Sequence, residues 1–200
     1  MPATWHIQHW PRCTHHVLLS HCAENRNELI IPVFEELAQS NVISWLDQHH
    51  YPSGRESHEA LRESLLKCRH VIYVVTPEML QQGRGWCALE CGYSAVIQRI
   101  LNDISHVELP LFFVDRTDPA LQRSVWSTLV DRGIFIPLKA HKQPVTWAVR
   151  KILQFVRREE TWASEILERL PCDHQLQSSL ANHNLRLRVT ACDLPPLEQD

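Results

Sequence analysis

Trp86 and Glu90 are the residues whose types and spacing most directly suggest chemistry, because they lie four apart in a segment with helical periodicity. At about 100° per residue, one face of this helix carries apolar side chains: Trp86, Leu89, Tyr93, Val96, Ile97 and Ile100. Glu90 falls inside that arc. Its carboxyl group must be desolvated, paired or directed into a pocket, since burying an uncompensated charge is costly. Its place near the helix N-terminus, where the helix dipole favours an anion, lowers that cost.

Two interpretations of Glu90 are open at this point. In the first, Glu90 forms an ordinary salt bridge at the edge of the apolar stripe, and Trp86 is a core aromatic residue. In the second, Glu90 is a desolvated functional carboxylate, which could stabilise positive charge that develops in a transition state. Periodicity by itself favours the salt bridge.

The composition of the chain excludes several classes of function. The formal net charge of −3 gives no basic field to attract nucleic acid or an anionic membrane. No apolar run approaches the roughly 20 residues of a membrane-spanning helix. The N-terminus has Trp, His and Gln where a secretion signal has an apolar core. We therefore expect a cytoplasmic protein without a nucleic-acid or membrane partner.

The cysteines, histidines and glycines show no recognisable metal or nucleotide motif. Seven cysteines, an odd number without a CxxC pair, indicate free thiols in a reducing compartment. Cys87 and Cys91 lack a matching second pair, so the 13 histidines fall in no zinc spacing and we expect no metal site. The chain has five glycines and neither a GxGxxG nor a P-loop motif, which argues against a phosphate cradle of those kinds.

Strand-like and helix-like segments alternate along most of the chain. The predicted strands are Val17–Ser20, Val42–Asp47, Val71–Thr76, Leu109–Asp115 and Gly133–Leu138. The predicted helices are Asn27–Gln39 (starting late or kinked at Pro32), one carrying Leu61 and Leu65, Trp86–Leu101, a short one from Asp118 to Asp131, and Val145–Leu170. A polar loop is expected from Gln48 through Gly54. This alternation predicts an α/β fold with a flavodoxin-like, five-stranded parallel sheet and helices on both faces.

The domain prediction has three parts: an N-terminal segment 1–14, the α/β domain 15–170 and a C-terminal appendage 171–200. In the appendage, Leu185 to Val189 alternates like a half-exposed strand, and its role is open. Ligands of doubly wound sheets bind outside the carboxyl ends of the strands. The loops after the first three strands are therefore where a site is expected.

Four sequence motifs in order and spacing resemble the TIR (Toll/interleukin-1 receptor) domain family over about residues 15–160. HVLLSH (16–21) resembles the first TIR strand, and SWLD (44–47) with Gly54 resembles the second strand and the loop known as the BB loop. KCRHVIYVVTPEML (67–80) is similar to the third strand and the segment after it. GWCALE (85–90) resembles the Trp-Cys-x-x-Glu motif of NAD⁺-cleaving members.

The resemblance implies an NAD⁺ nucleosidase or ADP-ribosyl cyclase with NAD⁺ as substrate and no cofactor. It makes Glu90 the catalytic carboxylate. The implied substrate-binding residues are Ser20, His21, Cys22, Asp47, Gly54 and Trp86. Cys22 departs from several family enzymes, which have a basic residue there, and this leaves the pyrophosphate contact of that loop unassigned.

The biological role is implied by the same resemblance. The chain is similar to the standalone, bacterial NAD-cleaving TIR subunit of Thoeris-like antiviral systems. This implies self-association and an ADP-ribose-derived, linear or cyclic messenger for a separate effector. The alternative is a non-catalytic TIR adaptor that mediates protein–protein signalling. A receiver-like flavodoxin fold is a third, less favoured interpretation, because the acidic Mg²⁺ pocket and strand-end lysine it requires are not found.

Overall fold

A parallel five-stranded sheet with the strand order β2-β1-β3-β4-β5 organises the computed structural model of the chain. The structure describes residues 13–50, 57–81, 85–100, 107–136 and 143–169. The strands are β1 (His15–Ser20), β2 (Ser44–Trp45), β3 (Cys68–Val75), β4 (Val107–Phe112) and β5 (Ile134–Phe135). All four pairings are parallel. The predicted flavodoxin-like fold is confirmed.

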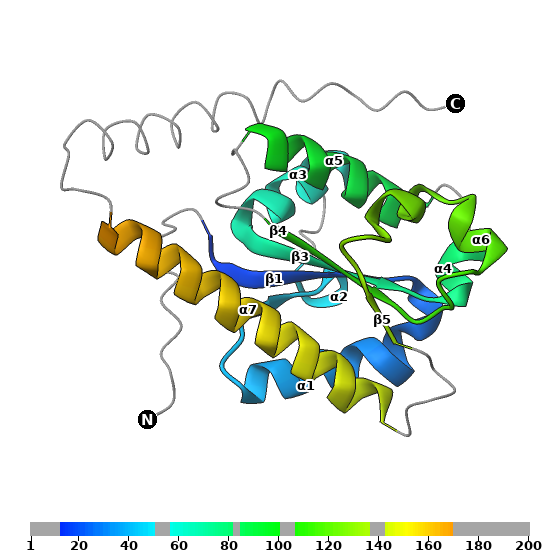
Figure 1. Cartoon of the computed structure of the whole chain (residues 1–200), viewed down its shortest axis with the longest axis horizontal. Coiled ribbons are helices and arrows are strands. Elements are labelled where there is room, and N and C mark those ends of the chain that lie inside the picture. The colour runs from blue at the N-terminus through cyan, green and yellow to red at the C-terminus, as the bar shows by residue number, and fades with distance from the viewer. Residues whose placement is uncertain (1–12, 51–56, 82–84, 101–106, 137–142, 170–200) are drawn as a thin grey trace. The chain divides into compact units, whose positions relative to one another are not determined.

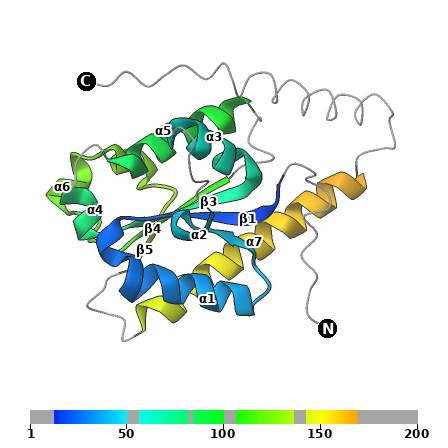
Figure 2. The same cartoon turned by 180° about the vertical axis from the view of Figure 1, so that it is seen from behind.

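Helices cover both faces of the sheet. The α-helices are α1 (Ile31–Gln39), α2 (Asp47–His50), α3 (Ser57–Lys67), α4 (Pro77–Gln81), α5 (Trp86–Ile100), α6 (Pro119–Gln122) and α7 (Pro144–Arg169). Shorter turns are η2 (Ala23–Asn25), the π-helical η3 (Arg26–Ile30) and η4 (Val125–Leu129). Figure 1 and Figure 2 show α1 and α7 on one face of the sheet and α3 and α5 on the other.

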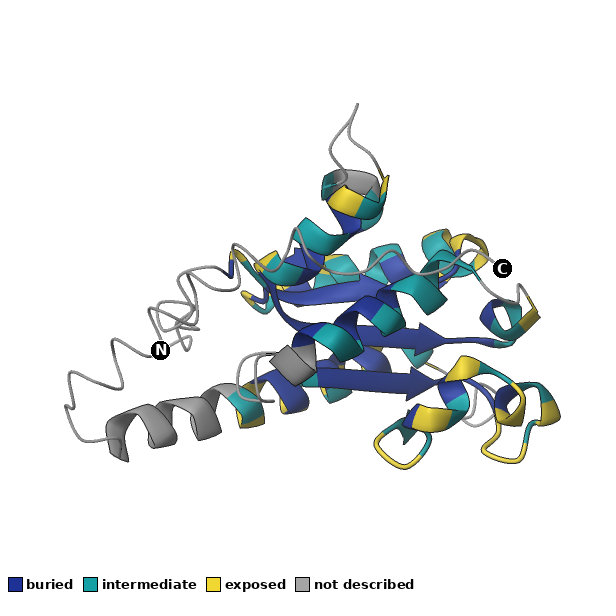
Figure 3. Cartoon of the chain, turned by 90° about the horizontal axis from the view of Figure 1, so that it is seen from above, coloured by how far each residue is buried: buried dark blue, intermediate teal, exposed yellow. Residues whose placement is uncertain are grey.

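One cluster of the hydrophobic core lies between the sheet and helices α1 and α7. Val17, Ile72 and Leu111 of three neighbouring strands are buried there against side chains of both helices. Strand β3 is buried along its whole length, as its run of β-branched residues predicts for a central strand covered on both faces. Figure 3 shows the strands as the buried layer of the domain.

Strand β2 is shorter than the predicted Val42–Asp47, and this prediction was wrong at both ends. The backbone N–H of Ile43 donates to the side chain of His16 in β1, at Nδ1 (2.9 Å), rather than to a backbone carbonyl. After Trp45, Leu46 N–H donates to His50 Nδ1 (3.0 Å), and Asp47 opens α2 in a stretch predicted to be loop. Side chains thus accept from the backbone N–H groups on both sides of β2, although the Ile43 carbonyl still accepts from His16 N–H of β1 (2.8 Å).

Two other helix predictions differ in detail. The segment before Pro32 forms the π-helical turn η3, and Pro32 lies in the first turn of α1, where its missing N–H costs nothing. The predicted helix from Asp118 to Asp131 is split into α6 and η4. Asp118 caps α6 by accepting a hydrogen bond from Ala120 N–H (2.7 Å).

The buried face of α5 differs from the apolar stripe predicted from the sequence, because Glu90 belongs to it. Its buried residues are Glu90, Tyr93, Ser94 and Ile97, whereas Leu89 and Val96 are half-buried. Glu90 therefore lies within the buried face rather than at its edge, and the salt-bridge interpretation loses its geometric basis.

The chain divides into two compact units, Met1–Arg157 and Arg158–Asp200. The predicted boundaries at residues 14 and 170 stay predictions, and Gly54 and the appendage 171–200 lie outside the described residues. Within the described ranges, no helix combines the length and apolar character that crossing a membrane requires.

Candidate functional site

A pocket of about 290 Å³ opens at the carboxyl edge of the sheet, where β1 lies between β2 and β3. This edge is where the order of chain connections reverses, the usual ligand position in doubly wound sheets. The lining residues come from the ends of β1 and β2, from η3, from α2, α4 and α5, and from η4. They are Leu19, His21, Cys22, Ala23, Arg26, Trp45, Asp47, Met79, Gly85, Trp86, Cys87, Ala88, Glu90 and Trp126.

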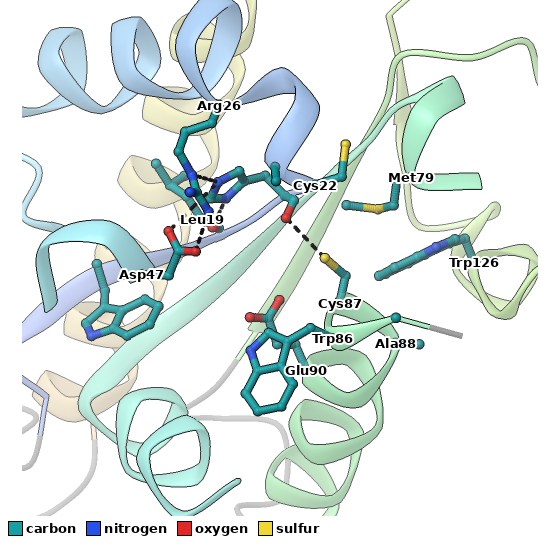
Figure 4. A pocket seen from close by; sticks show the side chains of 14 residues that line it. Leu19, Cys22, Arg26, Asp47, Met79, Trp86, Cys87, Ala88, Glu90 and Trp126 are labelled. Atoms are coloured by element: carbon teal, nitrogen blue, oxygen red, sulfur yellow. Dashed lines mark hydrogen bonds and ion pairs between the residues drawn. The ribbon is translucent and has the colours of Figure 1, made fainter. Parts of the chain in front are cut away.

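Glu90 enters the pocket from the first turns of α5. Glu90 is 5% exposed, and its Oε2 atom has no hydrogen-bond partner within the described part of the chain. The pKa of Glu90 is raised to about 8, chiefly by burial, with a hydrogen bond to Ser20 lowering it and the charge of Asp47 contributing to the rise. Figure 4 shows the Glu90 carboxyl directed into the space between Trp86, Asp47 and Cys87.

An ion pair lies across the pocket from Glu90. Arg26 Nη2 is 2.6 Å from Asp47 Oδ2, and both side chains are about one third exposed, at 30% and 36%. Arg26 belongs to the π-helical turn after β1, an irregularity that is frequent at functional sites. The pair joins that turn to the first residue of α2.

His21 is held as a neutral imidazole between two fixed partners. Its Nδ1 donates to the Leu19 carbonyl (3.0 Å), which leaves Nε2 to accept from Arg26 Nε–H (3.2 Å). Burial lowers the pKa of His21 more than the Leu19 carbonyl and Asp47 raise it. His21 is therefore a rigid wall of the pocket and not a cation near neutral pH.

Two cysteines line the pocket as weakly acidic thiols. Cys87 Sγ donates to the His21 carbonyl (3.1 Å), and burial raises the pKa of Cys87 to about 12. Cys22 Sγ donates to Asn25 Oδ1 (2.6 Å), and burial raises its pKa also. Neither thiol is prepared to act as a nucleophile, which needs the thiolate.

Asn25 fixes the wall that Cys22 and Met79 form. Its Oδ1 accepts hydrogen bonds from Cys22 and from Thr76 Oγ1 (2.5 Å), and its Nδ2 donates to Glu78 Oε2 (3.2 Å). Thr76 Oγ1 also accepts from Met79 N–H (3.3 Å). The loop after β1 is thereby tied to the loop after β3.

Most residues singled out from the sequence meet in this pocket. Five line it: His21, Cys22, Asp47, Trp86 and Glu90. Ser20, the last residue of β1, is buried beside Glu90 without lining the pocket, and Gly54 lies outside the described residues. Asp47 reaches the pocket from the start of α2, not from the end of a strand.

Sequence reasoning missed Arg26, Trp45, Met79, Cys87 and Trp126. Two of them had a local signal. Trp45 precedes Asp47 by two residues, and Arg26 lies five residues after His21, about one helical turn in the segment where a ligand loop was expected. Trp126 had none, because it lies far along the chain from the other lining residues and is brought to the pocket by tertiary packing, which includes its contact with Tyr73 (ring centroids 5.2 Å apart).

The described residues form no cluster suited to metal-dependent chemistry. No group of three or more His, Cys, Asp or Glu within them is arranged to hold a metal ion. The site instead combines a buried carboxyl, an ion pair and three indoles, from Trp45, Trp86 and Trp126. Such a set can bind a flat ring and stabilise positive charge.

Solved structures similar to this chain include three TIR proteins. The TIR domain of the Toll-related receptor TRR-2 from Hydra magnipapillata has 14% identity and a TM-score of 0.48, over 72% of this chain and 99% of that one. The TIR domains of the activated Roq1 resistosome, which directly recognises the pathogen effector XopQ, have 16% identity and a TM-score of 0.45, over 84% and 99%. A metazoan TIR-STING receptor from C. gigas has 15% identity and a TM-score of 0.43, over 60% and 40%.

The family of the chain is established by a family model, because these distant structures by themselves do not establish it. No curated protein matches the chain. The model described as "TIR domain" matches residues 17–170, which include every described strand and helix except the first two residues of β1. Since this match covers more than half of the 200 residues, the chain belongs to the TIR domain family.

Proposed function

We propose that this TIR domain cleaves the nicotinamide–ribose bond of NAD⁺, with Glu90 as the catalytic carboxylate. The observation that carries the proposal is the buried Glu90 side chain, which lines the pocket and whose Oε2 has no hydrogen-bond partner among the described residues. Structural carboxylates are paired when they are buried, because an unpaired one is costly. A carboxyl retained in this state has a functional explanation, and the Trp-Cys-x-x-Glu resemblance supplies one.

One carboxylate suffices for this reaction. Glycosidases use a second carboxyl group to protonate the leaving oxygen. Nicotinamide leaves from a cationic pyridinium as a neutral molecule, taking the electron pair of the C–N bond, so it needs no proton. The remaining difficulty is the oxocarbenium-like ribose. A desolvated carboxylate next to that sugar stabilises the developing charge and holds the ribose hydroxyls.

The product depends on which nucleophile captures the ribosyl cation. Attack by water on the anomeric carbon gives ADP-ribose and releases one proton. Attack by an adenine nitrogen or a ribose hydroxyl of the same molecule gives a cyclic isomer, again with loss of one proton. In both outcomes Glu90 has the same role, which is to stabilise the ribosyl cation.

The surrounding residues take separate roles in the proposal. Trp86 walls the nicotinamide–ribose region, and His21 and Cys22 line the cleft opposite. Arg26 contacts the pyrophosphate, since it brings a guanidinium to the pocket although Cys22 stands where related enzymes have a basic residue. Gly54 retains its predicted part in the loop that bends over the ligand.

The proposed biological setting is a cytoplasmic antiviral response. There the domain would self-associate on a trigger, and the ADP-ribose-derived product, linear or cyclic, would activate a separate effector. This setting rests on the Thoeris-like resemblance, whereas the reaction rests on the site.

NAD⁺ consumption by the purified full chain tests the proposal. The protein is incubated at nanomolar to high micromolar concentration with NAD⁺, and the products are separated by chromatography beside nicotinamide, ADP-ribose and cyclic ADP-ribose standards. Release of nicotinamide in equimolar amount with one ADP-ribose product supports it. A folded protein that releases no nicotinamide at any concentration refutes the enzyme and leaves the non-catalytic adaptor.

A further inference from the structure

The imidazole of His50 holds the end of the one-turn helix α2 against three neighbouring elements. Its ring centroid lies 4.9 Å from that of His15 in β1. The rings of Trp45 in β2 and Phe34 in α1 lie 6.1 Å and 6.3 Å from it. The His50 backbone N–H also donates to the Leu46 carbonyl (3.0 Å). Because a helix of four residues is too short to be stable by itself, α2 depends on such contacts for its position.

The contact between His15 and His50 brings together two rings of a type that gains a charge just below neutral pH. The ring planes cross at 78°, and both residues are half-buried. Partial burial screens a charge less than water does, so a proton on His15 is unfavourable beside a second ring that also attracts protons. Protonation of His15 therefore weakens the contact that holds His50.

The other groups around His15 add to this effect. Lys67, the last residue of α3, acts on His15 with its ammonium charge, and Glu63 pairs with that ammonium at 3.5 Å on the partly exposed surface of α3. His16, the next residue of β1, is a further neighbour that attracts protons. Cys68 of β3 is the register partner of His15, and burial raises the pKa of its thiol well above the ordinary value, so it carries no charge. The described surroundings of His15 thus favour its neutral form.

We propose that α2 is a wall of the pocket that acid releases, because a proton on His15 breaks the contact with His50 and frees α2 from β1. Trp45, on which the His50 ring stacks, and Asp47, the first residue of α2, both line the pocket. Release of α2 therefore changes the pocket although the proton binds outside it. This regulation goes beyond the proposed reaction and requires no turnover of NAD⁺.

The direction of the pH effect follows from the ionisation of His15. With α2 in place, the pKa of His15 is lowered from 6.5 to about 4, chiefly by burial, with charges on His50, Lys67 and His16 contributing. The docked state of α2 is therefore fully favoured above about pH 6.5 and loses stability as the pH falls toward 4. If α2 accounts for half or all of this shift, the ratio of released to docked α2 increases about tenfold to twentyfold between pH 7 and pH 5.

Hydrogen–deuterium exchange of the full chain measures this release. Catalytic activity is a poor readout, because Glu90 also changes its protonation with pH. Exchange is followed by mass spectrometry at pH 7, 6 and 5, and each rate is divided by the rate of an unstructured peptide at that pH. We expect the protection of segment 43–50 to fall about tenfold to twentyfold from pH 7 to pH 5, while that of β3 is retained.

Two results of the exchange measurement overturn the inference. Unchanged protection of segment 43–50 between pH 7 and pH 5 means that α2 stays docked in acid. An equal loss of protection in β3, the central strand, means that acid unfolds the whole domain and releases no separate part of it.

A matched pair of variants assigns the effect to His15. His15→Phe keeps a ring next to His50 but removes the group that titrates, so the protection of segment 43–50 should no longer depend on pH. His58→Phe replaces another half-buried histidine, whose ring lies 5.4 Å from that of Trp86, and should keep the wild-type pH dependence. Thermal melts verify that both variants fold. A pH dependence that survives in folded His15→Phe overturns the inference.

The titration of His15 in the wild-type chain gives a test that needs no variant. Its imidazole signals, assigned through the backbone by NMR, are followed from pH 8 to pH 4.5. We expect His15 to stay neutral until the pH is below 5 in molecules with α2 docked, and the loss of protection to accompany its protonation. If His15 titrates near 6.5 while segment 43–50 stays protected at pH 5, its proton does not release α2 and the inference is wrong.

Discussion

The guanidinium of Arg26 and the carboxylate of Asp47 meet at 2.6 Å, and this contact links the turn after β1 to the helix after β2. The two residues are 21 positions apart in the chain. Their contact places a guanidinium group at the pocket, which Cys22 also lines. In the proposed complex, the substrate pyrophosphate competes with Asp47 for Arg26.

Replacing Arg26 should weaken substrate binding more than it slows the chemical step. Arg26→Ala removes a charge-assisted hydrogen bond worth about 1.5–3 kcal/mol, so KM for NAD⁺ should rise roughly ten- to one-hundredfold with a smaller change in kcat. Nicotinamide riboside, which has the same scissile bond but no pyrophosphate, is the control substrate. An equal loss with both substrates would show that Arg26 acts by supporting His21 and not by binding phosphate.

Glu90→Gln should abolish NAD⁺ cleavage while preserving the fold, since Gln is nearly isosteric with Glu. If electrostatic stabilisation of the ribosyl cation dominates, the rate falls on the order of 10²–10³. The measurement is the initial rate of nicotinamide release at saturating NAD⁺, with Glu63→Gln as the matched control. Full activity in a folded Glu90→Gln protein would remove Glu90 from the mechanism.

The raised pKa of Glu90 also predicts how stability varies with pH. The folded state holds the Glu90 proton more tightly than the unfolded state, because the pKa rises from 4.5 to about 8 on burial. The Glu90 contribution to stability is therefore complete below about pH 4.5 and is lost as pH rises toward 8. The Glu90→Gln variant has no ionisable carboxyl group at this position, so it does not lose this stability as the pH rises.

The variant should consequently gain stability over wild type as the pH increases. The difference in free energy of unfolding should be small at pH 5 and grow by roughly 1–4 kcal/mol at pH 8. Urea denaturation of both proteins at each pH measures it. A difference that does not change between pH 5 and pH 8 would mean that the Glu90 pKa is close to its ordinary value.

The close packing of Gly133 against Phe112 leaves no room for a side chain at position 133. A Cβ atom at Gly133 would lie within 2.6 Å of Phe112 Cδ2, and that ring is buried and stacked on Phe135 with centroids 4.7 Å apart. Gly133→Ala should therefore destabilise the domain by about 1–3 kcal/mol, the usual cost of overpacking. Gly85→Ala, where nothing lies within 4 Å of the added Cβ, is the control in the same denaturation assay.

Activity per molecule should increase with protein concentration if the domain works as an assembly. The initial rate of nicotinamide release, divided by protein concentration, is compared from nanomolar to micromolar protein, with light scattering to give the size at each point. A constant specific activity in a verified monomer would count against self-association as a requirement for turnover.

Local sequence patterns predicted the elements with strong periodicity and singled out Glu90 as a polar residue among apolar ones. The β-branched run around Ile72 and Val74 could only be a strand covered on both faces, and β3 is buried throughout. The placement of Glu90 among apolar residues at helical spacing left an ordinary salt bridge and a desolvated carboxyl open and by itself favoured the salt bridge, whereas in the structure Glu90 is buried. These features depend on neighbours within one or two turns of the chain, so the sequence alone determines them.

The tertiary structure decided the rest, because it depends on which distant segments meet. At the two ends of β2, the imidazoles of His16 and His50 accept hydrogen bonds from the N–H groups of Ile43 and Leu46. The pocket is closed by contacts such as Cys87 with the His21 carbonyl, 66 residues apart, and by Trp126 from η4. Periodicity reports only which face of an element is apolar. The identity of the atoms opposite that face is set by the packing of the whole sheet and its helices.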